Sequence, residues 1–354
     1  MMPSASTGAE HPVLVAAARH GLGAVASVTV LHAPDAGWVL ESAQQDHLTG
    51  FLADAVVDGA VTIADPTVSG GLMTNWHLEL AACLDLERLT IDTGRLLDDA
   101  GIRWRLTKGA ASAHLDYPDP STRTFGDVDV VLHPDDWVRA LALLGANGYV
   151  RDPRHLSEEY DRRYGKGATF TTEGGLELDV HRRFAIGRFG VTSRMEDIFA
   201  SSDTLVLADQ PIPALAPHDR LLHACFHASL GGFRRLRAFR DVAQLIIVTE
   251  ADWERTFAAA VRWRAEVVVA SAILDTWARL GLDPDHPAPR RAALTEVSRG
   301  DRRALSVFRD ELSFRRQALT AVGRLRIIDR PRYLWSLGSR RLSLPHRSPQ
   351  ERDR

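Results

Sequence analysis

Cysteine is scarce in this chain of 354 residues, which has only Cys83 and Cys225. Both lie inside apolar runs typical of helices, so neither a disulfide framework nor a zinc site is expected, and a reducing cytoplasm fits this usage best. No uninterrupted apolar stretch reaches the roughly 18 residues that a membrane span requires, and the N-terminus lacks the positive charge of a secretion signal. We therefore expect a cytoplasmic protein with no membrane partner.

Lysine is almost absent, because Lys108 and Lys166 are the only two and arginine supplies the other positive charges. The formal net charge of -3 gives no global signal for nucleic acid or membrane binding. The Walker A loop, the His-Arg-Asp kinase loop, the Gly-x-Ser-x-Gly elbow and the Rossmann glycine fingerprint are also missing. Hydrophobic residues at 45% are ordinary for a globular protein, so a folded chain with some other chemistry is expected.

Length and periodicity predict more than one folded unit, because one core rarely grows beyond roughly 250–300 residues. Helical spacing before a glycine-rich break at residues 65–71 indicates a lead-in, and a long amphipathic helix follows that ends near Gly101. The predicted units are residues 1–74, an N-terminal helical lead-in; 75–215, a catalytic core of strands and helices; 216–314, a helical domain; and 315–354, a basic and partly irregular tail.

The most informative stretch is the alternating strand Val128–Leu132, which follows Asp127 directly and contains Asp129. Alternation aims both carboxylates at one side of a sheet, where they can hold Mg²⁺. The solvated face of an edge strand would show the same pattern. However, aspartate is disfavoured in strands, and these two are set among strongly apolar residues. The two acids are therefore predicted to serve a purpose other than solubility.

A third acid lies on a second alternating strand, Leu176–Val180, which follows the hairpin signal at residues 173–175. We choose Asp179, although Glu177 shares its face and would replace it if the strand phase were shifted. His181 lies on the same face and is a candidate metal or phosphate ligand, whereas a histidine on a half-buried strand is more often structural. Three such acids suit phosphoryl or nucleotidyl transfer with two metal ions.

A glycine turn precedes the acidic strand, because the weakly alternating strand Ile102–Thr107 is followed by Lys108 and Gly109. Glycine has no side chain, so the backbone N–H groups of such a turn can approach a phosphate, and a short helix starting at Ala110 would add its positive end. Lys108 can reach a phosphate as a mobile charge. Ser112 is a further candidate contact, or simply a small helix residue.

Other polar residues have weaker signals. Arg123 and Lys166 lie on loops beside the candidate strands and are further candidate phosphate contacts, although most loop cations are only solvated. His223 and His227 are spaced like a metal pair on one helical face, but they lack the Glu of His-Glu-x-x-His, so a packed helix is favoured over zinc. For the arginine-rich tail, 315–354, a solvated segment is favoured over an RNA-binding one.

Together these motifs resemble the bacterial uncharacterised nucleotidyltransferase family of the polymerase-β-like nucleotidyltransferase superfamily. The resemblance covers roughly residues 75–285 and rests on segments 108–110, 117–118, 123–132, 148–149, 178–181, 217–223 and 236–241, with residue 227. It implies an α+β fold in which helices flank a small mixed sheet. It also implies Gly109 at the phosphate-side turn, Asp127 and Asp129 as the metal pair, Asp179 as the third acid, and Mg²⁺ or Mn²⁺ with a nucleoside triphosphate (NTP). The superfamily commonly has Gly-Ser at this turn, where this chain has Gly109 and Ala110.

We therefore predict a metal-dependent nucleotidyltransferase that moves a nucleoside monophosphate (NMP) group from an NTP to a hydroxyl-type acceptor. Asp127 and Asp129 would bind metal, and Asp179 would hold the catalytic metal and help deprotonate the acceptor. The acceptor stays open between a small molecule, a natural product, a sugar, a peptide and tRNA. The alternatives are a non-catalytic nucleotide- or RNA-binding module, a toxin-type transferase acting on tRNA and a kinase-like phosphoryl transferase. Three desolvated carboxylates argue against a pure binder.

Overall fold

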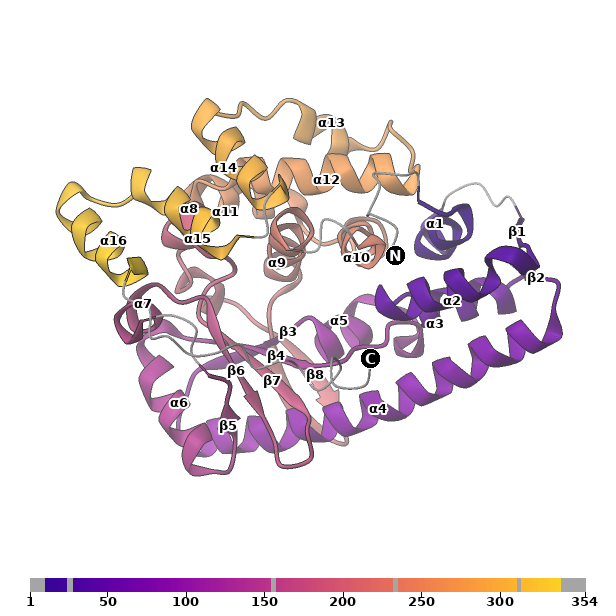
Figure 1. Cartoon of the computed structure of the whole chain (residues 1–354), viewed down its shortest axis with the longest axis horizontal. Helices are drawn as coiled ribbons and strands as arrows, with labels where there is room; N and C mark the ends of the chain where they lie inside the picture. The colour runs from indigo at the N-terminus through magenta and orange to yellow at the C-terminus, as the bar shows by residue number, and fades with distance from the viewer. Residues whose placement is uncertain (1–9, 24–27, 154–156, 232–234, 311–312, 339–354) are drawn as a thin grey trace.

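The computed structural model describes residues 10–23, 28–153, 157–231, 235–310 and 313–338. A mixed sheet of seven strands lies between a long helix and a helical bundle, as Figure 1 shows. The fold class is α+β, as predicted. Among the described helices, none combines the length and the apolar character that crossing a membrane would need. The last part of the predicted tail, 339–354, lies outside the described residues.

The sheet has the strand order β5-β6-β7-β4-β3-β9-β8. β4 pairs in parallel with β7, and β3 pairs in parallel with β9, whereas the other neighbours are antiparallel. The strands are β3 (Trp104–Thr107), β4 (Val128–Leu132), β5 (Val150–Arg151), β6 (Gly167–Thr171), β7 (Glu177–His181), β8 (Asp203–Leu207) and β9 (Gln210–Ala214). Three of them, β3, β4 and β7, confirm predicted strands, with small shifts at the ends of β3 and β7. The sequence did not predict β9, because it contains two prolines, which are normally disfavoured within a strand.

The two faces of the central strands differ in chemistry. Val128 and Val130 of β4 belong to an apolar core with residues of α4 (Pro66–Asp99) and α6 (Trp137–Ala146). Because side chains alternate along a strand, Asp129 and Val131 project from the opposite face. Val131 packs into the core of the helical bundle, so this second face is turned toward the bundle.

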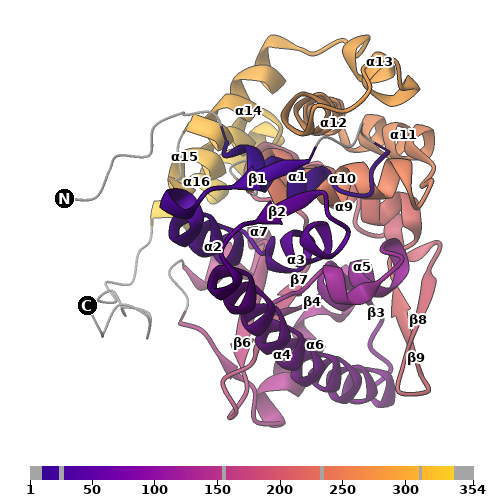
Figure 2. The same ribbon diagram turned by 90° about the vertical axis from the view of Figure 1, so that its right-hand side faces the viewer.

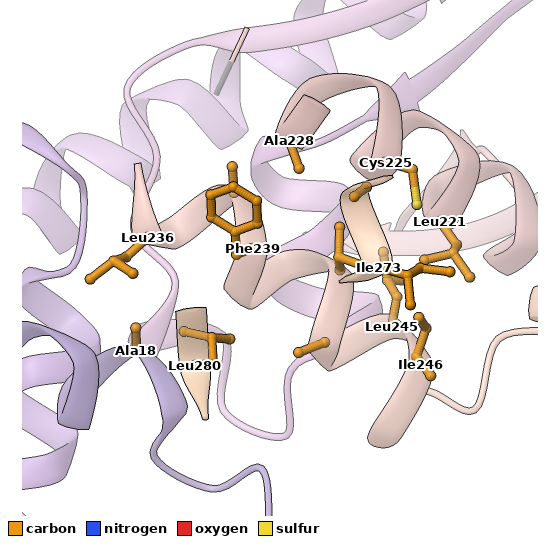
Figure 3. Close-up of a cluster of buried hydrophobic side chains, with 14 of the residues drawn as sticks. Ala18, Leu221, Cys225, Ala228, Leu236, Phe239, Leu245, Ile246, Ile273 and Leu280 are labelled. Carbon is orange, nitrogen blue, oxygen red and sulfur yellow. The ribbon is translucent and has the colours of Figure 1, made fainter. Parts of the chain in front are cut away.

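The bundle begins with four helices inside the region 216–314, where the sequence predicts a helical domain. They are α9 (Pro217–Leu230), α10 (Leu236–Ile247), α11 (Trp253–Trp263) and α12 (Glu266–Leu280), and α13 (Pro287–Ala293) and α14 (Arg299–Asp310) follow. Figure 3 shows Leu221 of α9, Leu245 of α10 and Ile273 of α12 meeting in one cluster. Ala18 of α1 (Pro12–Arg19) lies in the same apolar core, so the start of the chain packs onto the bundle.

The N-terminal region is more than the helical lead-in that the sequence predicts. It contains two short parallel strands, which Figure 2 shows beside its helices. After α1, its elements are β1 (Thr29–Leu31), η1 (Ala33–Asp35), α2 (Ala36–Gln45), α3 (Thr49–Val57) and β2 (Val61–Ile63). The strands are too short to show a period in the sequence, which explains the error.

The predicted break at residues 65–71 is also wrong, because α4 runs through both glycines and through residue 75 without interruption. Asp65 caps this helix by accepting from the N–H of Thr67, and Pro66 occupies its first position. Both are start signals of a helix, and they outweigh the cost of two glycines in a long helix.

Shorter helical elements complete the structure: α5 (Gly109–Asp116), η2 (Pro120–Thr122), η3 (Pro134–Asp136), α7 (Glu158–Tyr164), α8 (Gly187–Val191), η4 (Asp197–Phe199), α15 (Phe314–Leu319), η5 (Thr320–Gly323), η6 (Ile327–Asp329) and α16 (Arg330–Gly338). The described start of the tail, residues 315–338, is therefore largely helical. Buried Tyr333 of α16 packs against Tyr160 and Tyr164 of α7, and these ring contacts anchor the segment.

Candidate active site

Four side chains form a row across four neighbouring strands. Thr107 of β3 is paired with Asp129 of β4, Asp129 with Asp179 of β7, and Asp179 with Thr169 of β6. Paired residues project from the same face of a sheet, so the whole row faces the bundle. One carboxylate oxygen each of Asp129 and Asp179 and a ring nitrogen of His181 all lie within 4.8 Å of one another. The structure thus brings two of the three predicted acids together.

Asp127 lies directly before β4 and two residues from Asp129, which places it on the same face. Burial, followed by the charge of Asp129, raises the pKa of Asp127 to about 6. The charge of Asp179 acts in the same direction, so Asp127 belongs to the same acidic cluster, although it lies outside the 4.8 Å group. Glu177, the alternative third acid, is exposed at the start of β7.

Asp129 is 1% exposed and is held through a single oxygen. Lys108 Nζ donates to its Oδ1 at 2.7 Å, and Nε2 of His181 lies 2.6 Å from the same atom. Burial alone would raise the pKa of Asp129, but the charge of Lys108 and the bond to His181 hold it well below its ordinary value. The second oxygen, Oδ2, is buried and has no hydrogen-bond partner among the described residues.

The turn at Lys108 and Gly109 lies against the acids, as the sequence predicts. Both residues have positive φ, 48° for Lys108 and 28° for Gly109, and α5 begins at Gly109. A Cβ atom at Gly109 would lie 3.3 Å from the carbonyl oxygen of Asp127, so a larger residue would push the turn off the acidic strand. Ala110 and Ser112 are buried in the first turn of α5.

Arg123, which the sequence predicts as a phosphate contact, is bonded within the protein. Its side chain is 1% exposed and forms two hydrogen bonds of 2.8 Å with the carboxylate of Asp241 on α10. A third bond, of 3.0 Å, reaches the carbonyl oxygen of Gly109. Each of its three guanidinium nitrogens thus donates one hydrogen bond within the protein, and Arg123 ties the loop before Asp127 to the glycine turn and to the bundle.

Lys166 and His181 flank the acidic row. Lys166 forms no side-chain hydrogen bond within the described part of the chain, and burial, followed by the charge of Lys108, lowers its pKa to about 8. His181 is buried, and its Nδ1 is left without a partner among those residues. Gly167, paired with His181, allows the close approach, because a Cβ there would lie 2.5 Å from the carbonyl oxygen of Val180.

Several residues at the site were not predicted from sequence. Thr169 donates to Oδ1 of Asp179 at 2.6 Å and so orients that acid. His223 of α9 reaches the strand row, with its Nδ1 3.5 Å from Oγ1 of Thr107. A Cβ atom at Gly126 would lie 3.5 Å from the ring of His47, so the N-terminal region also borders the site. Only the spacing of His223 and His227 gave any sequence signal, and it did not indicate what they face.

A mixed sheet that carries convergent acids beside a glycine turn is the arrangement that the sequence led us to expect of a nucleotidyltransferase. A family model described as "Uncharacterised nucleotidyltransferase" matches residues 32–277, well over half of the chain. The chain therefore belongs to this nucleotidyltransferase family. No curated protein matches it.

Three solved structures are similar to this chain at low identity. The lincomycin-bound lincosamide antibiotic adenylyltransferase LnuA is 17% identical, and the match covers 45% of this chain and 94% of that chain with a TM-score of 0.31. A nucleotidyltransferase-like protein from Paracoccidioides brasiliensis is 17% identical, with 56% and 92% covered and a TM-score of 0.34. The antibiotic-resistance factor ANT(2'')-Ia is 12% identical, with 52% and 94% covered and a TM-score of 0.35. Likenesses this distant do not bear on the acceptor.

Proposed function

We propose that this protein transfers an NMP group from an NTP to a hydroxyl-type acceptor with the help of bound Mg²⁺. The observation that carries the proposal is the pairing of Asp129 with Asp179 on parallel strands, with Asp127 on the same face and the glycine turn alongside. Nucleotidyl transfer needs carboxylates grouped in this way, whereas a purely structural sheet has no use for them.

The residues present fit a divalent cation. Mg²⁺ prefers carboxylate oxygens, and the buried Oδ2 of Asp129 lacks any partner among the described residues. Asp127, Asp129 and Asp179 would hold the cation, and Mn²⁺ would be accepted by the same oxygens. When bound, such ions neutralise the triphosphate and make the acceptor hydroxyl more acidic.

The side chains of the protein would complete the reaction. Asp179, oriented by Thr169, would take the proton of the acceptor hydroxyl. The acceptor oxygen then bonds to the α-phosphorus, the bond from that phosphorus to the bridging oxygen breaks, and pyrophosphate leaves with the electron pair. Lys166, which has no side-chain partner within the described residues, would supply positive charge beside the transferred phosphate.

A non-catalytic nucleotide-binding module is the second candidate, and one observation favours it. Lys108 already compensates the charge of Asp129, and His181 is hydrogen-bonded to the same oxygen, so the acids can be stable without any metal. Retention of all three acids on one face favours catalysis, because a binder would gain nothing from carboxylates that repel triphosphate.

Two labelled forms of ATP, carrying the label on the α- or the γ-phosphate, would separate the candidates. The protein is incubated with each form, Mg²⁺ and a fractionated extract of small molecules, peptides and tRNA. Transfer of the α-label supports the proposal, transfer of the γ-label alone indicates a kinase-like enzyme, and binding with no transfer indicates a module. Asp179→Asn, which keeps the bond from Thr169, should abolish α-label transfer, whereas Asp85→Asn on the exposed face of α4 should leave it unchanged.

A further inference from the structure

Arg237 of α10 is a half-buried cation without a hydrogen-bonding partner in the described part of the chain, although the charges of Asp241 and Asp127 act on it. Within the described residues it forms neither a hydrogen bond nor an ion pair. Its neighbours differ, because Arg123 is bonded to Asp241 and Arg220 to Asp116. Burial, followed by the charge of Arg123, lowers the pKa of Arg237. A guanidinium in a partly dehydrated position is unfavourable unless an anion joins it, so this residue points to an anionic ligand.

Arg237 lines a cavity of about 20 Å³ together with Lys108, Ser112, His223 and His227, and the ion-paired Arg123, Arg220 and Asp241 also border it. A space of this size holds one water-sized group, such as a single phosphoryl oxygen. Apart from Asp241, whose charge Arg123 neutralises, the charged and polar groups around it are cations and hydrogen-bond donors, which is the chemistry of a phosphate subsite.

The two histidines add donors without adding charge. Burial, followed by the charge of Lys108, holds the pKa of both His223 and His227 well below the ordinary value. A neutral imidazole offers one N–H donor and one acceptor nitrogen. His227 has no side-chain hydrogen bond with any described residue, so its donor is free for a ligand.

The cavity adjoins the acidic cluster, because Lys108 lines the cavity and also bonds to Asp129. The charges of Arg237 and Asp127 influence one another, and Lys108 lies between the cavity and Asp129. An NTP whose α-phosphate lies at the acids would therefore direct its terminal phosphates toward Arg237.

We propose that Arg237, with Lys108, Ser112, His223 and His227, forms a subsite that binds an oxygen of the β- or γ-phosphate, the part of the NTP that leaves as pyrophosphate. The proposal rests on the nucleotidyl transfer proposed above. It gives the helical bundle a direct part in the reaction, because Arg237 and the two histidines come from α9 and α10. As the bond between the α-phosphorus and the bridging oxygen breaks, negative charge grows on the departing oxygen, where Arg237 and Lys108 stabilise it.

The test uses inorganic pyrophosphate as the probe and calorimetric titration of the full chain, with and without Mg²⁺. Arg237→Gln should weaken pyrophosphate binding by about tenfold or more, since hydrogen bonds to charged groups are lost. Arg237→Lys should fall between this variant and the wild type, because the charge remains but the two-pronged geometry is lost. The matched control is Arg255→Gln, an exposed arginine on α11, which should bind as the wild type does. Melting temperatures confirm that each variant is folded.

The outcomes separate this subsite from the proposed function. Equal pyrophosphate affinity in wild type and Arg237→Gln would overturn the subsite, even if α-label transfer is observed. Arg237-dependent pyrophosphate binding supports the subsite even if no acceptor ever receives the α-label. In Asp129→Asn, metal-free pyrophosphate binding should persist while transfer is lost; loss of both in a folded protein would contradict a subsite built by α9 and α10.

Discussion

Lys108 donates a hydrogen bond of 2.7 Å from Nζ to Oδ1 of Asp129, so a cation of the chain itself lies against the most buried acid of the site. The backbone of Lys108 has φ 48° and ψ −142°, a conformation that side-chain-bearing residues rarely adopt. The surrounding structure therefore maintains a strained residue at this position. The bond keeps the acidic row neutral enough to fold when no divalent ion is present.

Replacing Lys108 should separate the stability of the metal-free protein from its metal affinity. We expect Lys108→Met to lower the free energy of unfolding by about 2 kcal/mol, because buried Asp129 loses its cation. Mg²⁺ should then raise the melting temperature more than it does in wild type, since no ammonium competes for Asp129. Thermal melts over a Mg²⁺ series test both effects. If Lys108→Met and wild type had the same metal-free stability and the same rise in melting temperature with Mg²⁺, Lys108 would not be the compensating charge.

Metal binding should depend on pH through Asp127. Burial and the neighbouring acids raise its pKa to about 6, and a metal ion binds the deprotonated carboxylate. Mn²⁺ affinity should therefore be level above pH 7 and fall by about tenfold for each pH unit below 6. Titration of Mn²⁺ by electron paramagnetic resonance measures this profile. Asp127→Asn should bind more weakly and lose the step near pH 6; a step that survives in this variant would assign the titration to another group.

Arg123 should act on stability rather than on nucleotide affinity. Arg123→Gln leaves Asp241 buried without its cation, so we expect a loss of roughly 3 kcal/mol in the free energy of unfolding. The fraction that remains folded should still bind NTP with nearly wild-type affinity, because the guanidinium is bonded to Asp241 and Gly109. Urea denaturation of the variant measures the free energy of unfolding, and nucleotide titration of the same sample measures the NTP affinity. A large loss of affinity at unchanged stability would restore Arg123 as a phosphate contact.

Asp219 of α9 should make stability fall as pH rises. It is 5% exposed, and its Oδ2 lacks a hydrogen-bond partner among the described residues. Burial raises its pKa from 3.8 to about 7. Between these two values the folded protein holds a proton that the unfolded chain has lost. Stability is therefore greatest below pH 3.8 for this group and is lost toward pH 7, by up to about 1.4 kcal/mol per pH unit.

The control for Asp219 compares Asp219→Asn with Asp85→Asn. Asp219→Asn keeps the shape but cannot ionise, so its stability should vary less between pH 5 and 7 than that of wild type. Asp85 is exposed on α4, and its variant should retain the wild-type slope. Identical pH profiles for all three proteins would show that Asp219 does not ionise with a raised pKa.

Much of the acidic cluster could be predicted before any coordinates, and its surroundings could not. Alternation in β4 and β7 is a local property of a few residues, so the shared face of Asp127 and Asp129 follows from the chain alone. The pairing of Arg123 with Asp241 joins residues far apart in the sequence. No periodicity signals such an ion pair, and the loop position of Arg123 instead indicated a contact with phosphate.

In the N-terminal region too, local features could be predicted from the sequence and long-range contacts could not. Helical spacing predicted helices there, but the parallel pair of β1 and β2 is too short to be seen in a period, and the approach of His47 to Gly126 depends on how the region docks. For the long helix α4, the sequence contains the start signals Asp65 and Pro66. The two glycines that follow nevertheless led to the prediction of a break.

The sequence by itself determined which side chains share a strand face, where the glycine turn falls and that residues 216–314 are helical, because each depends on neighbours a few residues apart. Only the tertiary structure decided that β4 and β7 are parallel neighbours with Asp129 opposite Asp179, and that α9 and α10 bring His223 and Arg237 to the glycine turn. Those relationships arise from burying two faces of one sheet at once, and that packing involves residues from the whole chain.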